Sequence, residues 1–237
     1  MKSGSDIRRQ GLSELSVATL ADNAPAVKSL LKANPELAEV SYITPKLYRS
    51  KIFHWIYVGD SVLHLAAAGY RTEIVRLLLE CGADPNAACN RRRSTPLHYA
   101  ADGFITGPAW NAKQQVKTID CLIAGGARID IQDKNGATPL HRAVRTRCAK
   151  AVEFLLQAGC DPHISNNSGS TPFHLAVQNT GRGASGEPIA IHAQEQIVKI
   201  FLKFGLSPNN PGGSRKSVFA SARSEKIRKL LLPRDKE

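Results

Sequence analysis

Apolar residues along the chain gather into short segments with helical spacing, and each segment is followed by a turn that contains glycine. Leu, Ile and Val at this spacing predict a helix with one buried face. A Gly soon after the last apolar residue is a common signal for the end of a helix. The segments and their turns are residues 74–79 with Gly82-Ala83-Asp84, 119–123 with Gly126-Ala127-Arg128, 152–156 with Gly159-Cys160-Asp161, and 197–202 with Gly205-Leu206-Ser207.

A second motif, Thr-Pro followed by an apolar residue and His, precedes these segments. A Thr side chain can accept a hydrogen bond at the start of a helix, and Pro is tolerated in the first turn because the N–H that it lacks has no partner within the helix. Each copy therefore predicts the start of a further short helix. The copies are Thr95-Pro96-Leu97-His98, Thr138-Pro139-Leu140-His141, Thr171-Pro172-Phe173-His174 and, in a relaxed form, Ser61-Val62-Leu63-His64.

The two motifs alternate at a regular interval. The His residues of successive copies lie 34, 43 and 33 positions apart, and a period in this range is typical of stacked helical repeats. With its sub-motifs in this order, the chain resembles the ankyrin-repeat family over roughly residues 12–232. The resemblance implies an all-α repeat solenoid of about six helix pairs with β-hairpin fingers and degenerate end caps.

The repeats define a predicted division of the chain, which we expect to form one domain over residues 1–237. Terminal units of a repeat array depart from the pattern because one of their faces meets water, and insertions fall in loops. The predicted parts are an N-terminal cap helix pair (12–37), a long aromatic finger (38–59), repeats at 60–89, 90–132, 133–165 and 166–209 with insertions at 104–115 and 180–193, and a C-terminal cap (216–232).

The long finger is unusually rich in aromatic residues. Tyr42, Tyr48, Phe53, Trp55 and Tyr57 all lie within it. One interpretation is a small core beneath an extended hairpin. The alternative is an exposed aromatic anchor of the kind that dominates protein interfaces.

Composition indicates a folded protein with an excess of positive charge. The hydrophobic share of 42% with 22% charged residues is that of an ordinary globular chain. The net charge of +12 favours acidic proteins, nucleic acid or an anionic membrane surface as partners, without ranking them. Five cysteines show no CxxC pattern, which indicates reduced thiols. No stretch is apolar for long enough to span a bilayer, so we expect a soluble protein, cytoplasmic or otherwise intracellular, without membrane insertion.

The resemblance also implies where a partner would bind, at the finger tips and at the exposed ends of the first helices. Arg93 stands where the family normally has the finger Gly, so three successive arginines lie at the tip of one finger: Arg91, Arg92 and Arg93. With Lys134 and Arg145 they would form a basic patch suited to carboxylates or phosphates. The alternative is a solvated, solubilising face. The predicted contact residues are Tyr57, Val58, Asp60, Arg91, Arg92, Arg93, Ser94, Asp102, Lys134, Asn135, Arg145, Thr146, Asn167, Ser168 and Gln178.

The recurring His residues are interpreted as structural. In the family this His ties neighbouring fingers together through hydrogen bonds, and no carboxylate or Cys joins it at metal-ligand spacing. The chain also lacks a Walker loop, a GxSxG elbow, an HExxH motif and a dinucleotide fingerprint. We therefore expect no enzyme activity, no metal and no cofactor. The resemblance further implies that Asn86 is a candidate for hydroxylation, provided that the host is an animal.

The predicted function is that of a non-catalytic protein-interaction module or adaptor. Its pre-formed concave face would bind one protein, which charge allows to be acidic. One alternative is binding of nucleic acid or another polyanion through the basic patch, with a steep loss of affinity as salt increases. Another is a bacterial effector that acts by binding a host protein. The oligomeric state is left open.

Overall fold

A computed structural model describes residues 4–47, 52, 54–103, 105–107, 110–178, 187–210, 213 and 216–232. The chain forms two compact units. The first contains residues 1–100 and 113–134, and the second contains residues 101–112 and 135–237. The prediction of a single domain therefore stays a prediction, and the two units are described in turn.

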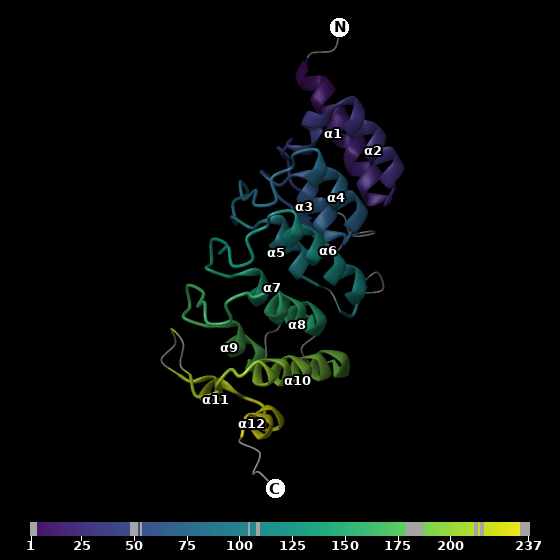
Figure 1. Cartoon of the computed structure of the whole chain (residues 1–237). Coiled ribbons are helices and arrows are strands. Elements are labelled where there is room, and N and C mark those ends of the chain that lie inside the picture. Colours follow the sequence, from purple (N-terminus) through teal and green to yellow (C-terminus); the bar gives the residue numbers. More distant parts are fainter. Residues whose placement is uncertain are drawn as a thin grey trace. The chain divides into compact units, whose positions relative to one another are not determined.

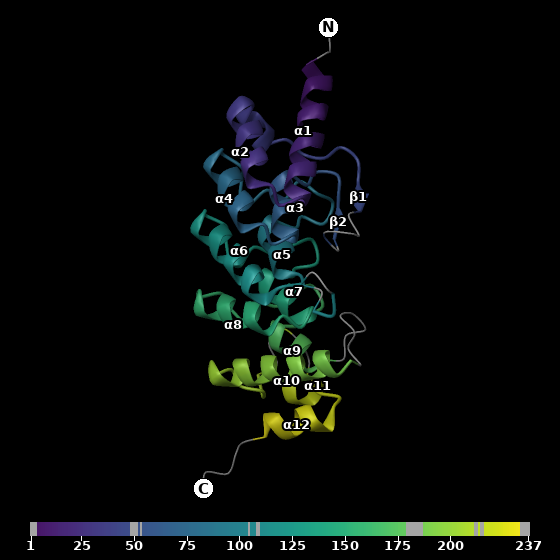
Figure 2. The ribbon, with the colours of Figure 1, turned by 90° about the vertical axis from the view of Figure 1, so that its right-hand side faces the viewer.

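The first unit is built from short helices and one small antiparallel sheet. Helix α1 lies beside α2 and α3, and α4 contacts both α2 and α3 (Figure 1). The two strands of the sheet are labelled β1 and β2 in Figure 2. Lys46 pairs with Ile56 and Leu47 with Trp55. The elements are α1 (Gly4–Leu20), α2 (Ala24–Ala33), the 3-10 helix η1 (Pro35–Ala38), β1 (Lys46–Leu47), β2 (Trp55–Ile56), α3 (Val62–Ala68), α4 (Thr72–Glu80), α5 (Pro96–Ala101) and α6 (Ala112–Ala124).

The second unit repeats the same helix-pair arrangement. Helix α7 contacts α8 and α9, and α10 contacts α8, α9 and α12. The elements are α7 (Pro139–Arg145), α8 (Ala149–Gln157), α9 (Pro172–Val177), α10 (Pro188–Lys203), α11 (Val218–Ser221) and α12 (Glu225–Leu231). The fold is thus the predicted all-α repeat solenoid.

The recurring motif starts the first helix of each pair. The N–H of Thr138 donates a hydrogen bond to Nδ1 of His141 over 3.2 Å, and the Thr138 Oγ1 accepts one from the His141 N–H. Pro139 occupies the first turn, where its missing N–H costs nothing. The same reciprocal capping joins Thr171 to His174. Local chemistry alone therefore fixes where these helices begin.

Small and branched apolar residues fill the space between helices. Ala66, Ala100, Ala143 and Ala176 are all fully buried, so their helices approach closely. Leu140 is buried in the same layer as Ala143. The buried face of each pair supplies most of the stability of a repeat, because short helices are marginal alone.

Three predicted boundaries are wrong. Helix α1 begins at Gly4 rather than near residue 12. The insertion predicted at 104–115 ends sooner, because α6 begins at Ala112. The insertion predicted at 180–193 likewise ends before α10, which begins at Pro188.

Buried glutamines explain the last two corrections. Gln115 is fully buried and its Nε2 donates a hydrogen bond to the carbonyl of Ala100 over 3.0 Å. Gln194 does the same to Ala176 over 2.8 Å. Each glutamine extends the second helix toward the first by satisfying a carbonyl at the end of the first helix. A pattern of apolar residues does not reveal such helical turns.

Candidate protein-binding surface

The finger tips share a backbone frame that an asparagine holds in place. In the finger at residues 90–94, Oδ1 of Asn90 accepts hydrogen bonds from the N–H groups of Arg92 (3.0 Å) and Ser94 (3.1 Å). In the finger at residues 166–170, Asn166 accepts from the N–H groups of Ser168 (2.9 Å) and Ser170 (3.1 Å). Such Asx-type contacts hold a tight turn with little freedom.

Each tip contains one residue in the left-handed region. Gly136 and Gly169 have φ angles of 71° and 74°, and Arg93 has a φ angle of 52°. A Cβ at Gly136 would also lie 2.8 Å from the backbone N of Asn167, so both the angle and the space there require Gly. Arg93 therefore occupies the conformation that glycine occupies in the neighbouring repeats.

The repeated histidines connect each helix start to the next finger. Nε2 of His64 lies 3.1 Å from the carbonyl oxygen of Ser94, and Nε2 of His141 lies 3.0 Å from that of Ser170. His174 makes the same contact with the carbonyl of Lys216 over 3.0 Å. Their Nδ1 atoms lie at the helix caps, so both ring nitrogens of each His have a structural partner.

A pocket opens between the long finger and the arginine-rich finger of the first unit. It has a volume of about 400 Å³ and is lined by Pro45, Trp55, Tyr57, Val58 and Arg91. The side chains of Trp55 and Val58 are 48% and 50% exposed. We call it the Trp55–Arg91 pocket. Exposed apolar side chains beside a cation are a common composition for the centre of an interface.

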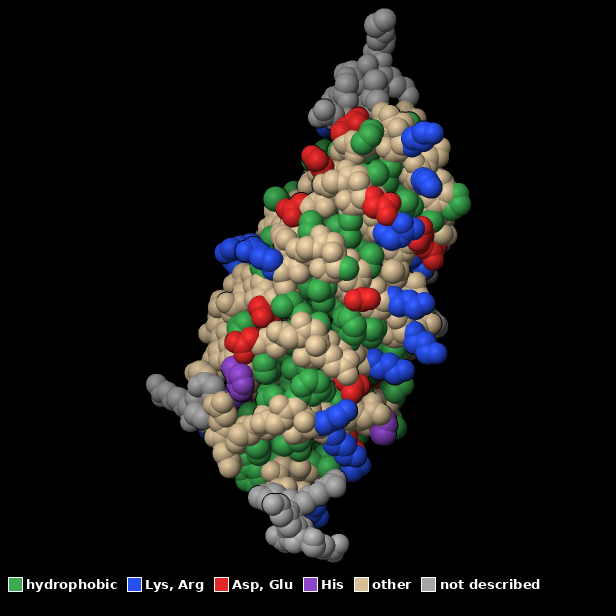
Figure 3. All heavy atoms as spheres, viewed as in Figure 1, with side chains coloured by type: hydrophobic (Ala, Val, Ile, Leu, Met, Phe, Trp, Pro, Cys, Tyr) green, Lys and Arg blue, Asp and Glu red, His purple; other side chains and the backbone are tan. Residues whose placement is uncertain are grey.

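The guanidinium groups of two arginines lie over the ring of the tyrosine in this pocket. The Cζ atoms of Arg91 and Arg92 lie 5.4 Å and 4.8 Å from the centroid of the Tyr57 ring. Cation–π contacts of this kind orient the guanidinium groups without neutralising them. Figure 3 shows one group of Lys and Arg side chains at the left edge of the view, on the side where finger loops project in Figure 1, and further Lys and Arg side chains along the right-hand side.

The long finger combines both features that its sequence allowed. Tyr42 is buried and its hydroxyl lies 2.6 Å from Oγ of Ser16, which places it in a small core. Ile56 is also fully buried, whereas Trp55 on the opposite side of the strand is half exposed. Tyr48 and Phe53 lie outside the described residues.

Two of the expected contact residues are buried and must be removed from the set. Asp60 is fully buried: Oδ1 accepts from Nδ2 of Asn90 over 2.8 Å, and Oδ2 accepts from the Tyr99 hydroxyl over 2.6 Å. Ser94 is 1% exposed. A partner that docks on the finished surface cannot touch either side chain.

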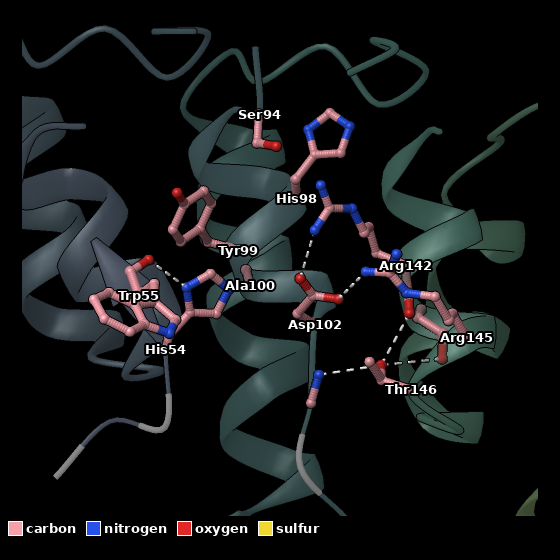
Figure 4. Close-up of polar contacts among 12 residues, drawn as sticks. His54, Trp55, Ser94, His98, Tyr99, Ala100, Asp102, Arg142, Arg145 and Thr146 are labelled. Atoms are coloured by element: carbon pink, nitrogen blue, oxygen red, sulfur yellow. Dashed lines mark hydrogen bonds and ion pairs between the residues drawn. The ribbon is translucent and has the colours of Figure 1, made fainter. Parts of the chain in front are cut away.

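In the second unit, three other expected contact residues form a network of their own (Figure 4). Oδ2 of Asp102 accepts a hydrogen bond from Nη1 of Arg142 over 2.8 Å, and Oδ1 accepts one from Nη2 of Arg145 over 3.4 Å. Oγ1 of Thr146 accepts from the N–H of Gly103 and donates to the carbonyl of Arg142. Arg145 is therefore paired with the carboxylate of Asp102, whereas the prediction placed it in a basic patch.

The basic patch of the first unit is consequently Arg91, Arg92, Arg93 and Lys134. The N–H of Lys134 donates to the carbonyl of Arg92 over 2.8 Å, which holds the two tips together. In the second unit the N–H of Asn167 donates to the carbonyl of Asn135 over 3.0 Å in the same way. Arg91, Arg93, Lys134, Asn135, Asn167 and Ser168 are exposed, as is Val58, whereas Tyr57, Arg92 and Gln178 are half-buried.

Two buried arginines were not anticipated from the sequence. Arg142 is 4% exposed and pairs with Asp102. Arg147 is 1% exposed, and its Nη2 donates to the carbonyl of Gln178 over 2.7 Å. Burial lowers the pKa of Arg147 to about 10, so it stays charged at neutral pH. Its position after α7 anchors the end of α9 and therefore the backbone at Gln178.

Ser61, His64 and Asp60 have the composition of a catalytic triad, but a substrate could not reach them because all three side chains are buried. Oγ of Ser61 lies 3.1 Å from Nδ1 of His64, whose Nε2 lies 3.7 Å from Oδ1 of Asp60. All three side chains are buried, and burial lowers the pKa of His64 despite the nearby Asp60 carboxylate. The same Ser/Thr–His contact recurs in other repeats, where it caps a helix.

The described part of the chain contains neither a metal-ligand cluster nor a membrane-spanning helix. No group of three His, Cys, Asp or Glu residues there is placed to hold a metal ion. None of the helices in those residues combines the length and the apolar character needed to cross a bilayer. Asn86 joins two loops, since its Nδ2 donates to the carbonyl of Gly126 and its Oδ1 accepts from the N–H of Arg128. Its hydroxylation stays a prediction.

Comparison with known proteins matches the repeat pattern directly. A family model described as "Ankyrin repeats (3 copies)" matches residues 15–106 and 109–209. Among similar proteins, the E3 ubiquitin-protein ligase XB3 of Oryza sativa subsp. japonica is 38% identical over 76 residues, which is 32% of this chain and 14% of that protein. The neurogenic locus notch homolog protein 4 of Homo sapiens is 35% identical over 92 residues, or 39% and 4%.

A third relative is the ankyrin repeat and SOCS box protein 3 of Bos taurus, 32% identical over 111 residues, which is 37% of this chain and 21% of that protein. The chain therefore spans at most 21% of the length of these three curated relatives.

Proposed function

Because the chain belongs to the ankyrin-repeat family, we propose that it is a non-catalytic module that binds a partner protein on its finger surface. Ankyrin repeats are generally protein–protein interaction modules. Each of the three relatives matches this chain over a segment of a much longer protein, and the names of these proteins differ widely. A shared repeat segment in unlike proteins supports a binding role that is independent of any one activity.

The observation that carries the proposal is the contrast between rigid frames and exposed tips. Asn90 and Asn166 hold the turns, while Trp55, Arg91 and Asn167 present side chains to solvent. A surface that is ordered before binding loses little conformational entropy when a partner docks. The fingers therefore have the geometry of a pre-formed recognition surface.

We further propose that the module acts as an adaptor inside the cell. The structure forms no disulfide bond at any of its five cysteines, which fits a reducing compartment; they are Cys81, Cys89, Cys121, Cys148 and Cys160. The excess positive charge supports an acidic partner. Binding of nucleic acid is the rival that the same charge supports, so the experiment separates the two.

The test is affinity capture with two finger variants and a control that matches the charge change of the second variant. The immobilised chain is incubated with cell lysate, with and without nuclease and at low and moderate salt, and retained proteins are identified by mass spectrometry. One variant carries Trp55→Ala with Val58→Asp, and the other carries Asn167→Arg with Ser168→Arg. The control carries Gln157→Arg with Gln196→Arg on exposed faces of α8 and α10.

We expect a discrete protein that survives nuclease and is released by at least one finger variant but not by the control. Retention that disappears with nuclease would shift the assignment to nucleic acid, because phosphate contacts dominate such binding. A protein held equally by wild type and both finger variants would contradict the proposed surface.

A further inference from the structure

The Trp55–Arg91 pocket is large enough to hold a bulky side chain. Its volume of about 400 Å³ lies within the range of small-ligand sites. Apolar groups from Pro45, Trp55 and Val58 line it, and Trp55 and Val58 are about half exposed. Ile56 is buried behind them, so alternation along the strand fixes Trp55 on the outer face.

The rim of this pocket is cationic and uncompensated. Within the described part of the chain, no carboxylate pairs with Arg91, Arg92 or Arg93. Stacking on Tyr57 holds the guanidinium groups of Arg91 and Arg92 beside the pocket. A guanidinium has its N–H donors in the plane of the group, where they can bind a carboxylate in bidentate fashion.

The third arginine has a backbone conformation that is disfavoured for a residue with a Cβ. Arg93 has a φ angle of 52°, a left-handed conformation that costs a residue with a Cβ free energy. Gly136 and Gly169 fill the same place in other fingers at no such cost. A strained cation at the tip of the finger that lines the pocket supports a binding role for this tip.

From this juxtaposition we propose that the Trp55–Arg91 pocket binds an acidic linear segment of the partner protein. One large apolar side chain of the segment enters the pocket, and flanking carboxylates pair with Arg91, Arg92 and Arg93. The inference rests on the proposed function and specifies the chemistry of the partner. It also locates the proposed binding site in the first unit.

The lining favours a peptide over a nucleic acid. Single-stranded nucleic acids bind along successive aromatic platforms on which bases stack. Here Tyr57 already carries two guanidinium groups, which leaves Trp55 as the exposed aromatic side chain of the pocket. The aliphatic contributions of Pro45 and Val58 suit one inserted apolar side chain instead.

The experiment measures binding of fluorescent probes to the full chain by anisotropy. The first probe is a short peptide of aspartate and glutamate around a central phenylalanine. The second replaces the phenylalanine by alanine, and the third replaces the acids by asparagine and glutamine. The fourth probe is an oligothymidine. Each is titrated into wild type, Trp55→Ala, Arg91→Gln and the control Arg128→Gln, which removes an exposed arginine outside the pocket.

We expect the acidic phenylalanine peptide to bind most tightly. Trp55→Ala and Arg91→Gln should each weaken it by about tenfold or more, as for loss of an interface anchor, and Arg128→Gln should leave it unchanged. Because Trp55 borders a strand, thermal unfolding is measured for every variant. Val58→Asp repeats the test if Trp55→Ala alters folding.

Three results would overturn the inference. Equal affinity for the phenylalanine and alanine peptides would show that the pocket is not used. Tighter binding of oligothymidine would assign the arginines to phosphates. Absence of peptide binding would also reject it, while the proposed function would stand if capture of a protein depended on Asn167 and Ser168.

Discussion

The finger at residues 90–94 and the finger at residues 166–170 have the same frame but different tips. In both, an asparagine side chain accepts two backbone N–H groups. The first tip has Arg93 in the left-handed position and the second has Gly169. The two fingers thus share the fold of the turn but differ in the exposed residue at the tip. In the first finger that residue is Arg93, whose left-handed backbone has a conformational cost.

The frames also differ in burial. Asn90 is 2% exposed and its Nδ2 donates to the buried carboxylate of Asp60, whereas Asn166 is only half-buried. The first finger is thus joined to the long finger through a buried polar network that includes Tyr99. Substitutions in the frame and in the tip can therefore be compared between the two fingers.

The largest effect should come from the shared core. Leu140→Ala removes a side chain that is 1% exposed, so it should lower the free energy of unfolding by about 2 to 5 kcal/mol. Chemical denaturation measures this change. A cost near zero would contradict the assignment of Leu140 to the buried face of its repeat.

The next effect should separate the two frames. Asn90→Ala leaves the Asp60 carboxylate without its Asn90 donor, so we expect a loss of about 3 kcal/mol, more than for a neutral hydrogen bond. Asn166→Ala removes two neutral turn contacts, one exposed and one part-buried, and should cost about 1 kcal/mol. Denaturation of both variants under one condition gives the comparison, and equal costs would refute the distinction.

Acidification should weaken the first unit through His64. Burial is the main cause that lowers the pKa of His64 below 6.5. Just below that pH, His64 is therefore protonated in the unfolded chain but still neutral in the folded chain. Stability should therefore fall as the pH decreases from 6.5 toward the folded pKa. Denaturation midpoints across this window, compared with His64→Asn, test the assignment. An unchanged pH dependence in the variant would exclude His64 as the source.

A further small effect on stability concerns the left-handed residue. Arg93→Gly should stabilise the protein by up to about 1 kcal/mol, because glycine relieves the strain but gains entropy when unfolded. Gly169→Arg should destabilise it by about 1 to 2 kcal/mol. Thermal unfolding of the two variants checks the signs, and a destabilising Arg93→Gly would mean that the Arg93 side chain itself supports the fold.

Sequence reasoning found the elements that local chemistry determines. Thr138 and His141 carry enough information to start a helix, and the interval between such motifs identified the repeat family. It misplaced the starts of α6 and α10, because Gln115 and Gln194 are polar yet buried. Pro188 at the first turn of α10 was a usable signal, since proline favours that position.

The candidate surface was predictable in outline but not in detail. Aligning the repeats selected Val58, Arg91 and Asn167, which are exposed, but also Asp60, which is buried. Burial of Asp60 depends on Asn90 and Tyr99, which are distant in sequence. The pairing of Asp102 with Arg142 is likewise a contact between repeats that alignment does not show.

The most direct measurement exchanges the charged tip and follows binding and folding together. The variant that carries Arg91→Glu, Arg92→Glu and Arg93→Glu is compared with wild type for affinity toward the captured partner protein and for thermal unfolding. The account predicts that affinity falls by about tenfold or more through charge reversal, while stability changes by less than about 0.5 kcal/mol, as at other surface positions. Unaltered affinity in the folded variant would contradict the claim that this finger surface holds the partner.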